Sequence, residues 1–425
     1  MNRIEKLIAE LCPDGVEVKK LGEICGFRNG YSFNSKIFKE SGLPIIRIIN
    51  IQNNQVILEN LKYFALEDYN NSLANYEIRK GDILIALSGA TTGKVGIYNN
   101  NEVSYLNQRV GKFLPNNKIL NNKYLYYYLL TKTTYLYNLA SGGAQPNLSS
   151  NDLMEKFFIP LPPLPIQEEI VKILDTFTAL EAELEAELEA ELEARRKQYE
   201  YYRNTLLTPV ERNGRWYLNG VEVEWKKLGE IATVSGAGVD KKINPNEKQV
   251  ILLNYMDVYK NKYIRKETPK MVVTSKEYKV ATCNILKGDI FITPSSETIN
   301  DIGKSALAVE DLPNTVYSYH IMRIRLFKPN IITSMFINYF FDSEAIKIQI
   351  LSKAKGITRF GLTKSQWEEI PIPLPPLPIQ EEIVKILDTF TELEAELEAE
   401  LEAELEARRK QYEYYRNKLL NFSNR

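Results

Sequence analysis

The sequence is poor in the residues that build covalent or metal-based sites. Its 425 residues include one histidine, His320, and three cysteines, Cys12, Cys25 and Cys283. The cysteines form neither a disulfide framework nor a CxxC pair, which suits a reducing compartment. With a single histidine, the sequence also argues against a Cys/His zinc site.

Long apolar runs are missing as well. No run approaches the roughly 18 residues that a membrane span needs, and the start, MNRIEKLIAELC, lacks the pattern of a secretory signal. We therefore expect a soluble, cytoplasmic protein. Because 44% of the residues are hydrophobic, a chain of this length can build about two or three domains with a core each.

Recognisable catalytic motifs are the third absence. Residues 89–95 resemble a phosphate-binding loop but are one residue short and lack the magnesium-binding hydroxyl, and residues 235–238 lack the third glycine of a dinucleotide site. Asp82 and Asp289, each in a Lys-Gly-Asp sequence, could be metal ligands. A turn leading into a buried strand is the better interpretation, because Gly and Asp favour turns. No nucleophile motif surrounds the histidine, so we predict a non-catalytic chain.

What the chain does contain is a long segment that occurs twice. Ile159–Asn204 and Ile372–Asn417 are identical except that Ala179 is replaced by Glu392. Each copy follows a longer segment of quite different sequence. The chain therefore reads as head, arm, head, arm. The predicted boundaries are 1–162 for the first head, 163–207 for the first arm, 208–375 for the second head, and 376–425 for the second arm and tail.

Each arm is predicted to be one long helix. The proline runs 160–165 and 371–378 lack the N–H groups that a helix needs, so we expect the helix to begin after them. Apolar residues then recur with helical spacing. The LEAE repeats alternate like a strand, but Leu, Glu and Ala are strong helix formers and the run is too long for a strand. From Gln167 to Leu207 this gives a helix of about 60 Å.

An arm should need a partner, because its glutamates place like charges on neighbouring turns. We expect the two arms to pair antiparallel, which would set the basic stretch 195–197 near Asp388 and Glu392, and the basic stretch 408–410 near Asp175. A solvated single helix or a homodimeric zipper is the alternative. One LEAE unit more or less would advance the helix by about 6 Å and rotate it by about 40°. The repeat thus resembles an adjustable spacer.

The two heads are related. Lys19–Ile24 matches Lys226–Ile231, and Lys80–Ile83 matches Lys287–Ile290, in each case with residue numbers that differ by 207. Short β-branched and aromatic runs predict a sheet. Residues 122–139 and 334–350 predict one helix late in each head. The predicted fold class is α+β: two similar heads joined by two long antiparallel coiled-coil helices with pseudo-two-fold symmetry.

Charge separates heads from arms. Residues 163–207 hold 5 Lys/Arg against 11 Asp/Glu, and residues 376–420 hold 6 against 12. Residues 1–162 hold 18 against 14, and residues 208–375 hold 24 against 18. Two basic heads on acidic arms suit a phosphate backbone as the heads' partner.

The heads also carry side chains suited to reading DNA, since Arg and Lys grip guanine edges or phosphates and Asn and Gln can pair with adenine. The candidate DNA-binding residues are Arg28, Tyr31, Arg47, Ser88, Lys94, Gln108, Arg109, Gln145 and Asn147 in the first head, and Lys241, Lys242, Asn254, Ser295, Lys304, Arg323 and Arg359 in the second.

Taken together, these features resemble one known family. The head-arm-head-arm order, the KKLGEI and KGDIL segments, LNQRV at 106–110, GAQPNLS at 143–149 and the IPLPPLPIQEEIV arm entry resemble the specificity subunit of type I restriction–modification systems. The resemblance covers essentially the whole chain. The second head departs from it, because Ser-Glu-Thr follows Ser295 and GITRFGLT at 356–363 replaces the Gln-Pro-Asn form.

The resemblance implies a division of labour. Two target recognition domains would read the two halves of a split target in double-stranded DNA, and the arms would space them and dock two modification (methyltransferase) subunits. Two restriction subunits would join them. S-adenosylmethionine, ATP and magnesium would belong to those partners, and this chain would hold no cofactor. One alternative is an enzyme that acts on nucleic acid by itself, which would require a motif for nucleotide, metal or methyl-donor binding that the sequence does not offer. The other is a coiled-coil scaffold protein without a DNA-reading role.

Overall fold

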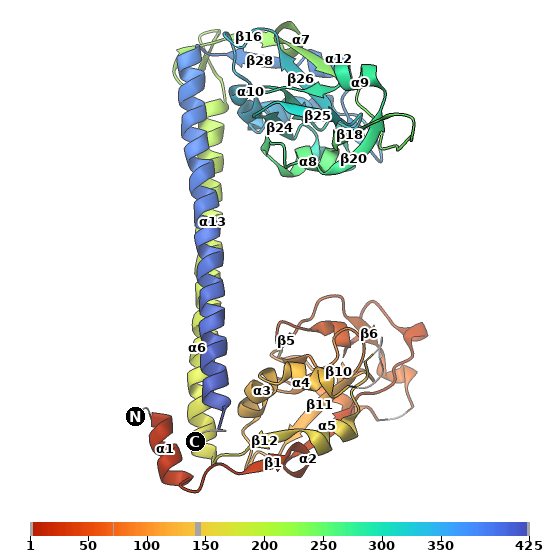
Figure 1. Ribbon diagram of the computed structural model, residues 1–425, viewed down its shortest axis with the longest axis vertical. Helices are drawn as coiled ribbons and strands as arrows, with labels where there is room; N and C mark the ends of the chain where they lie inside the picture. The colour runs from red at the N-terminus through yellow and green to blue at the C-terminus, as the bar shows by residue number, and fades with distance from the viewer. Residues whose placement is uncertain (1–2, 71, 141–145, 423–425) are drawn as a thin grey trace. The chain divides into compact units, whose positions relative to one another are not determined.

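The computed structural model describes residues 3–70, 72–140 and 146–422, and the chain forms two compact units (Figure 1). The first unit comprises Met1–Glu187 and Glu402–Arg425, and the second comprises Leu188–Leu401. Each unit contains one strand-rich head together with part of both long helices, α6 (Leu164–Leu207) and α13 (Leu377–Leu420). None of the described helices combines the length and apolar character that a membrane crossing requires.

The head of the first unit is built on two sheets. One has the order β2-β11-β8-β9-β5-β4 and the other the order β6-β3-β10-β7, while β1 and β12 pair separately. The strands are β1 (Val18–Lys20), β2 (Cys25–Asn29), β3 (Leu43–Ile46), β4 (Ile51–Gln52), β5 (Gln55–Val56), β6 (Lys62–Phe64), β7 (Glu77–Ile78), β8 (Ile83–Ala86), β9 (Val95–Ile97), β10 (Ser104–Leu106), β11 (Val110–Pro115) and β12 (Phe158–Pro160). The helices are α1 (Arg3–Leu11), α2 (Leu21–Ile24), α3 (Asn122–Leu130), α4 (Thr133–Asn138) and α5 (Ser150–Lys156), with 3-10 turns at Ser35–Ile37, Ile48–Asn50, Leu66–Asp68 and Ala74–Tyr76.

The head of the second unit repeats this plan with additions. Its main sheets have the orders β17-β26-β22-β24-β19 and β20-β18-β25-β21, and β16 and β28 pair separately as β1 and β12 do. It adds the three-stranded sheet β13-β14-β15, and a short pair, β23-β27, takes the place of the Ser88–Asn147 bridge of the first head. The strands are β13 (Val210–Arg212), β14 (Arg215–Leu218), β15 (Val221–Glu222), β16 (Glu224–Lys227), β17 (Ala232–Ser235), β18 (Lys248–Leu253), β19 (Tyr263–Ile264), β20 (Met271–Ser275), β21 (Asn284–Ile285), β22 (Ile290–Ile292), β23 (Ser295–Ser296), β24 (Ser305–Ala308), β25 (Leu312–Tyr317), β26 (Met322–Leu326), β27 (Phe360–Gly361) and β28 (Pro371–Leu374). The helices are α7 (Leu228–Ile231), α8 (Tyr255–Lys260), α9 (Glu277–Thr282), α10 (Ser334–Phe340), α11 (Glu344–Lys353) and α12 (Lys364–Glu368), with a 3-10 turn at Ile299–Asp301.

The α+β prediction is confirmed, as is the turn predicted at each Lys-Gly-Asp sequence. Asp82 accepts a hydrogen bond from the backbone N–H of Arg79 at 2.8 Å, and Asp289 accepts one from Leu286 at 2.8 Å. Each aspartate directly precedes a buried strand, β8 or β22. The carboxylates therefore close turns.

The single helix predicted late in each head is wrong in both heads, because the chain breaks there. Helix α3 is followed by α4, and α10 by α11. In the first head the Thr131 hydroxyl donates to the carbonyl oxygen of Tyr128 at 2.7 Å. In the second head Ser343 caps α11, because its hydroxyl oxygen accepts from the N–H of Ile346. Such local side-chain bonds compete with helix continuation.

The long helices begin slightly earlier than predicted. They start at Leu164 and Leu377 and have 44 residues each, so Pro165 and Pro378 lie inside the first turn. Proline is tolerated there because the first N–H groups of a helix have no intrahelical partner. The choice of helix over strand for the LEAE repeats is confirmed.

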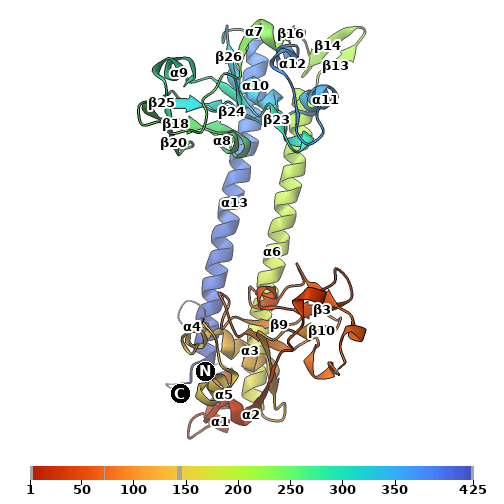
Figure 2. The same cartoon turned by 90° about the vertical axis from the view of Figure 1, so that its right-hand side faces the viewer.

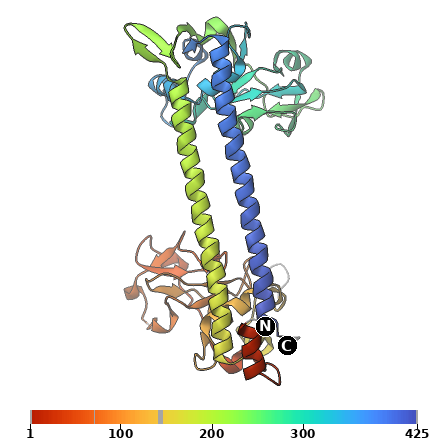
Figure 3. The ribbon, with the colours of Figure 1, turned by 90° about the vertical axis from the view of Figure 1, so that its left-hand side faces the viewer.

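The antiparallel pairing is also confirmed, within each unit separately (Figures 2 and 3). In the second unit Arg196 of α6 bonds Glu394 and Glu398 of α13 at 3.0 and 2.6 Å. In the first unit Arg409 of α13 makes the equivalent bonds to Glu181, at 3.0 Å, and Glu185 of α6. Exposed ion pairs of this kind fix the register more than they add stability.

The predicted register was wrong by about one to two helical turns. Asp175 and Asp388 do not receive the basic stretches, because the heads occupy them: the Tyr127 hydroxyl donates to Asp175 at 2.6 Å and the Tyr263 hydroxyl donates to Asp388 at 2.7 Å. Arg196 bonds the next glutamates along the helix, Glu394 and Glu398, instead of Glu392.

A buried glutamine joins each head to its helix. Gln167, with no exposed surface, accepts a hydrogen bond from the N–H of Asn121 at 2.8 Å. Its amide donates to the carbonyl oxygens of Ile119 and Pro162 at 2.9 and 2.7 Å. Gln380 repeats all three bonds in the second unit, with Thr333, Ile331 and Pro375 at 2.8 to 3.0 Å. A buried amide that satisfies three backbone groups defines the docking geometry of each head.

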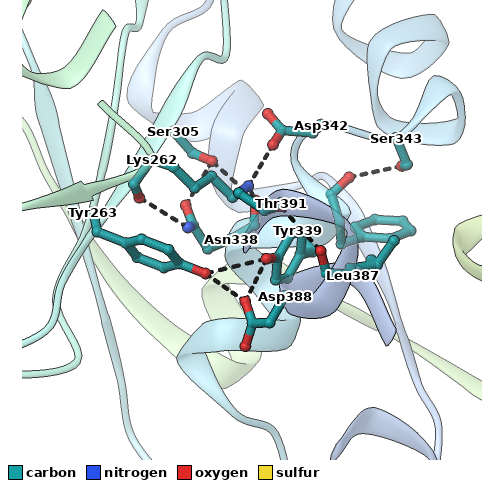
Figure 4. A network of polar contacts seen from close by, with 11 residues as sticks. Lys262, Tyr263, Ser305, Asn338, Tyr339, Asp342, Ser343, Leu387, Asp388 and Thr391 are labelled. Carbon is teal, nitrogen blue, oxygen red and sulfur yellow. Dashed lines mark hydrogen bonds and ion pairs between the residues drawn. The ribbon is translucent and has the colours of Figure 1, made fainter. Parts of the chain in front are cut away.

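The second unit adds an enclosed polar network at the same junction (Figure 4). Lys262 forms an ion pair with Asp342 and donates to the carbonyl oxygen of Asn338 at 2.7 Å. Burial lowers the pKa of Lys262, and the nearby Asp342 opposes that shift. Alongside, the Tyr339 hydroxyl donates to Asp388, and burial together with this bond raises the pKa of Tyr339. Strands, helix α10 and α13 are thereby tied together.

Tryptophan occurs only in the second unit. The Trp367 side chain has no exposed surface and lies in the main core of that unit. Trp216 and Trp225 meet edge to face, with ring centroids 5.6 Å apart. The first unit uses tyrosine instead, as in the consecutive buried residues 126–128 of α3.

Candidate nucleic-acid interface

Three neighbouring segments of the first head bring predicted residues together. The turn at 107–110 lies beside residue 87, because the N–H of Leu87 donates to the carbonyl oxygen of Arg109 at 2.9 Å. On the other side of the same segment, Ser88 pairs with Asn147 in an antiparallel bridge. The side chains of Gln108, Arg109 and Asn147 are exposed. These segments form one surface of polar side chains.

The remaining predicted residues of the first head lie around this surface in different ways. Tyr31 bridges to Asn107 but packs its ring within 5.1 to 5.7 Å of Phe33, Tyr69 and Tyr76. Arg47 follows β3, and its guanidinium donates a hydrogen bond to the carbonyl oxygen of Asn60 at 2.7 Å. This bond holds the guanidinium against the protein backbone.

The other four predicted residues of this head differ in exposure. Arg28, on β2, and Lys94, at the start of β9, are exposed. The hydroxyl of Ser88 is buried and has no hydrogen-bond partner among the residues that the structure describes. Gln145 lies outside the described residues.

The second head forms the equivalent surface from equivalent segments. Val239 bridges to Ser318 as Tyr31 bridges to Asn107, and Ser295 pairs with Gly361 as Ser88 pairs with Asn147. The exposed Arg359 donates to the hydroxyl oxygen of Ser295 at 3.1 Å. The N–H of Ser318 donates to the carbonyl oxygen of Leu253, which places Asn254 beside the same turn.

Sequence reasoning missed two residues of this surface, Tyr319 and His320. Tyr319 is 49% exposed, and its ring centroid lies 4.0 Å from that of His320. Both occupy the turn that corresponds to Gln108 and Arg109. A constant offset of 207 could not find them, because the loop between β22 and β24 is four residues longer than the loop between β8 and β9.

Cations gather around this histidine. Burial is the first cause that lowers the pKa of His320, and the nearby charges of Lys241 and Arg359 lower it further, whereas Asp240 opposes them. Lys242 forms an ion pair with Asp240 at 2.8 Å, and this bond lowers the pKa of the carboxyl group. The second head thus presents a surface whose positive charge exceeds its negative charge.

Two predicted residues of the second head lie apart from these exposed side chains. Arg323 is 9% exposed, donates to the carbonyl oxygen of Asn284 at 2.6 Å and lies over the Tyr317 ring. Its guanidinium therefore supports the sheet instead of facing solvent. Lys304 is half-buried at the end of the loop that begins at Thr293, as Lys94 ends the loop that begins at Ala86.

A glycine in each head permits the close approach on which this surface depends. A Cβ atom at Gly30 would lie 1.9 Å from the carbonyl oxygen of Asn107, and one at Gly238 would lie 2.3 Å from the carbonyl carbon of Ser318. Any larger residue would push the turn away from its neighbour. The framework is the same in both heads, although the exposed side chains differ.

The helix pair carries a groove of similar size in each unit. In the second unit Tyr199, Phe390, Leu393 and Leu397 line about 190 Å³, and in the first unit Tyr412, Phe177, Leu180 and Leu184 line about 230 Å³. These sets occupy equivalent positions of the two arm sequences. Leu180 and Leu393 are 56% and 52% exposed, so apolar side chains remain open to solvent at both grooves.

Such an arrangement is suited to binding. Basic and amide side chains on a fixed backbone framework can contact phosphates and base edges, and the grooves can receive apolar side chains. In the described part of the chain, no three His, Cys, Asp or Glu side chains gather as a metal site would require. Fold and surface together define a two-headed binding protein.

Comparison with known proteins identifies the family. The family model described as the type I restriction modification DNA specificity domain matches twice, at residues 13–194 and 220–407. The EcoR124I/EcoR124II specificity subunit of Escherichia coli is 30% identical over 99% of this chain and 97% of its own length. The chain therefore belongs to the type I restriction–modification DNA specificity family.

Solved structures share the fold. A chain from a type I R-M system, studied for its complex assembly and conformational transition, matches with a TM-score of 0.66 at 17% identity, over 96% of this chain and 98% of that one. The HsdS subunit of Thermoanaerobacter tengcongensis matches with a TM-score of 0.53 at 18% identity, over 96% and 97%. Family and fold support a role in DNA sequence recognition within a restriction–modification system.

Proposed function

We propose that this chain reads a bipartite DNA target and carries the modification and restriction subunits of a type I complex to it. Each head would read one half of the target. The chain would contribute no catalytic group, and S-adenosylmethionine, ATP and magnesium would be held by the partner subunits.

One observation carries this proposal: the two heads repeat a framework and vary a surface. The bridges Tyr31–Asn107 and Ser88–Asn147 have counterparts in Val239–Ser318 and Ser295–Gly361. Direct readout depends on the donor and acceptor pattern of the side chains that reach base edges. Two different half-sites would require two different patterns of donors and acceptors on the same backbone framework. A scaffold protein would not require such a difference between its heads.

The arms supply the proposed docking sites for partners. Two equivalent grooves with exposed leucine rims, one in each unit, suit two copies of one partner, because the same apolar side chains are offered twice. Glutamates at their edges add a negative rim that favours basic side chains on the partner. We assign these grooves to two modification subunits.

The LEAE repeats are proposed to set the distance between half-sites. Deleting one unit from each arm, for example residues 184–187 and 397–400, shortens each helix by about 6 Å, or about two base pairs of B-form DNA. The expected result is a methylated motif whose two halves are unchanged but closer together. An unchanged spacing after both deletions refutes this part of the proposal.

The decisive experiment combines the chain with its cognate modification subunit and maps adenine methylation on random-sequence DNA. A single motif of two fixed halves with fixed spacing is expected. The modification subunit alone, as the control, should give no sequence preference.

Two results would overturn the proposal. Methylation without sequence preference would favour the alternative that the chain is a coiled-coil scaffold. Specific methylation by the modification subunit alone would move recognition to that partner.

A further inference from the structure

Ile357 is the most exposed large apolar side chain among the described residues, at 94%. It lies in the loop between α11 and α12, beside the candidate surface of the second head. Single exposed apolar residues are common on proteins, so exposure alone decides nothing. Two further features of the loop indicate a function for this exposed side chain.

The first feature is that the loop is closed and held. Lys355 and Gly361 exchange backbone hydrogen bonds of 3.3 and 3.1 Å across its base. Gly356 has a φ of +154°, and a Cβ atom there would lie 1.9 Å from the carbonyl oxygen of Arg359. Arg359 in turn anchors the loop to Ser295 at 3.1 Å. Glycine and arginine thus keep the isoleucine at the tip.

The second feature is charge. The loop contains Lys355 and Arg359, Lys353 and Lys364 flank it at the ends of α11 and α12, and residues 353–364 include no acidic residue. Arg359 and Lys241 also lower the pKa of His320, so the positive charge of this loop acts on the turn that carries Tyr319 and His320. The loop therefore presents an apolar tip surrounded by cations. It suits a polyanion whose stacked interior is apolar, as duplex DNA is.

We propose that Ile357 is a wedge that inserts between two neighbouring base pairs of the half-site read by the second head, while Lys355 and Arg359 hold the flanking phosphates. Apolar wedges of this kind partly unstack a base step and kink the duplex, and the distortion is favoured at flexible steps. The isoleucine thereby becomes a specificity residue that reads deformability. The inference rests on the proposed function, and it adds a mode of reading to it.

The first head provides an internal comparison. The corresponding segment, residues 141–146, has the sequence Ser-Gly-Gly-Ala-Gln-Pro and no large aliphatic residue. The distortion is therefore expected in one half-site only.

The test uses the full chain with its modification subunit and duplexes of the mapped motif that carry 2-aminopurine at successive positions of both halves. With wild-type protein, fluorescence should rise at one step of the second head's half-site and at none in the other, once the adenines that become methylated are left out, because methyltransferases extrude their target base from the duplex. Ile357→Ala should abolish the rise and weaken binding about tenfold, with an unchanged salt dependence. Ile357→Leu should retain both properties.

Two control variants separate the wedge from its surroundings. Ile348→Ala removes another exposed isoleucine, on α11 at 61% exposure, and should change neither fluorescence nor affinity. Lys355→Gln should keep the fluorescence rise but lower the slope of the salt dependence by about one unit.

Several outcomes would overturn the inference. If the motif is read but no step shows a rise, or if Ile357→Ala matches wild type, the wedge is wrong while the proposed function stands. If Ile357→Ala binds DNA normally but no longer forms the complex with the modification subunit, the residue contacts protein instead. If wild-type protein reads no motif, the proposed function fails and the wedge fails with it.

Discussion

The two heads carry different side chains on a shared backbone framework. At the same turn the first head presents Gln108 and Arg109, whereas the second presents Tyr319 and His320. Beneath these turns the glycine approach, the paired segments and the buried glutamine of the junction are repeated with nearly the same geometry. Backbone contacts that both heads share therefore position the surface, whereas the side chains on that surface differ between the heads. Four experiments test this interpretation.

The largest effect is expected from making the heads alike. Replacing residues 21–158 with residues 228–371 would put the second head in both places, joined at segments that are equivalent in the two units. The half-site of the first head should disappear from the methylation map, and that of the second should occur twice. Retention of the original motif would mean that the heads do not read it. The reciprocal replacement is the matched control.

The next effect concerns the shared junction. Gln167→Ala and Gln380→Ala each leave three buried backbone groups without partners, at a cost of about 2 to 4 kcal/mol of unfolding free energy. The two losses should be similar, and urea unfolding followed by circular dichroism measures them. Gln198→Ala and Gln411→Ala, exposed on the same helices, should change little. A large difference between the two buried glutamines would break the equivalence of the junctions.

A smaller effect, confined to the second head, should depend on pH. The pKa of His320 is lowered from its ordinary value of 6.5, so protonation below that value adds positive charge to the proposed surface. DNA binding should tighten about threefold to tenfold as the pH falls from 7.5 to 5.5, measured by anisotropy on the mapped duplex.

The variant His320→Gln isolates this effect, because the chain has no other histidine. This variant is expected to lose the pH dependence of DNA binding. An unchanged pH dependence would show that a group on the partner subunit causes it. The effect of pH on folding stability has the opposite sign to its effect on DNA binding. Because the unfolded chain protonates His320 more readily, folding loses stability as the pH falls below 6.5.

The smallest effect is expected at the exposed ion pairs of the helices. Arg196→Ala and Arg409→Ala should each cost less than about 1 kcal/mol of unfolding free energy, since both arginine side chains are 59% exposed and their charges are screened by salt. Thermal unfolding at low and high salt measures the loss, which should shrink at high salt. A cost that survives high salt would contradict a purely exposed pair.

Much of this architecture follows from sequence, because the signals involved are local. Leu, Glu and Ala specify the helices, and Lys-Gly-Asp specifies a turn before a buried strand. The register of the helices did not follow, since Tyr127 and Tyr263 reach Asp175 and Asp388 from the heads. These tyrosines lie far from the aspartates in the sequence.

The candidate surface was less predictable than the framework. Arg323 is of a residue type suited to reading DNA, but its side chain is only 9% exposed and contacts Asn284 and Tyr317. His320 was hidden by a loop-length difference that shifts the frame by four residues. Residue type indicates what a side chain can bind, but exposure depends on contacts made across the fold.

The distribution of tryptophan gives the molecule a built-in optical label. Trp216, Trp225 and Trp367 all belong to the second unit, and the first unit is rich in tyrosine but contains no tryptophan in its sequence. Excitation at wavelengths that only indole absorbs therefore reports on one half of the protein and is silent for the other. Emission and far-ultraviolet signals recorded in one titration would reveal whether the two halves melt together or in sequence, without a dye or a mutation.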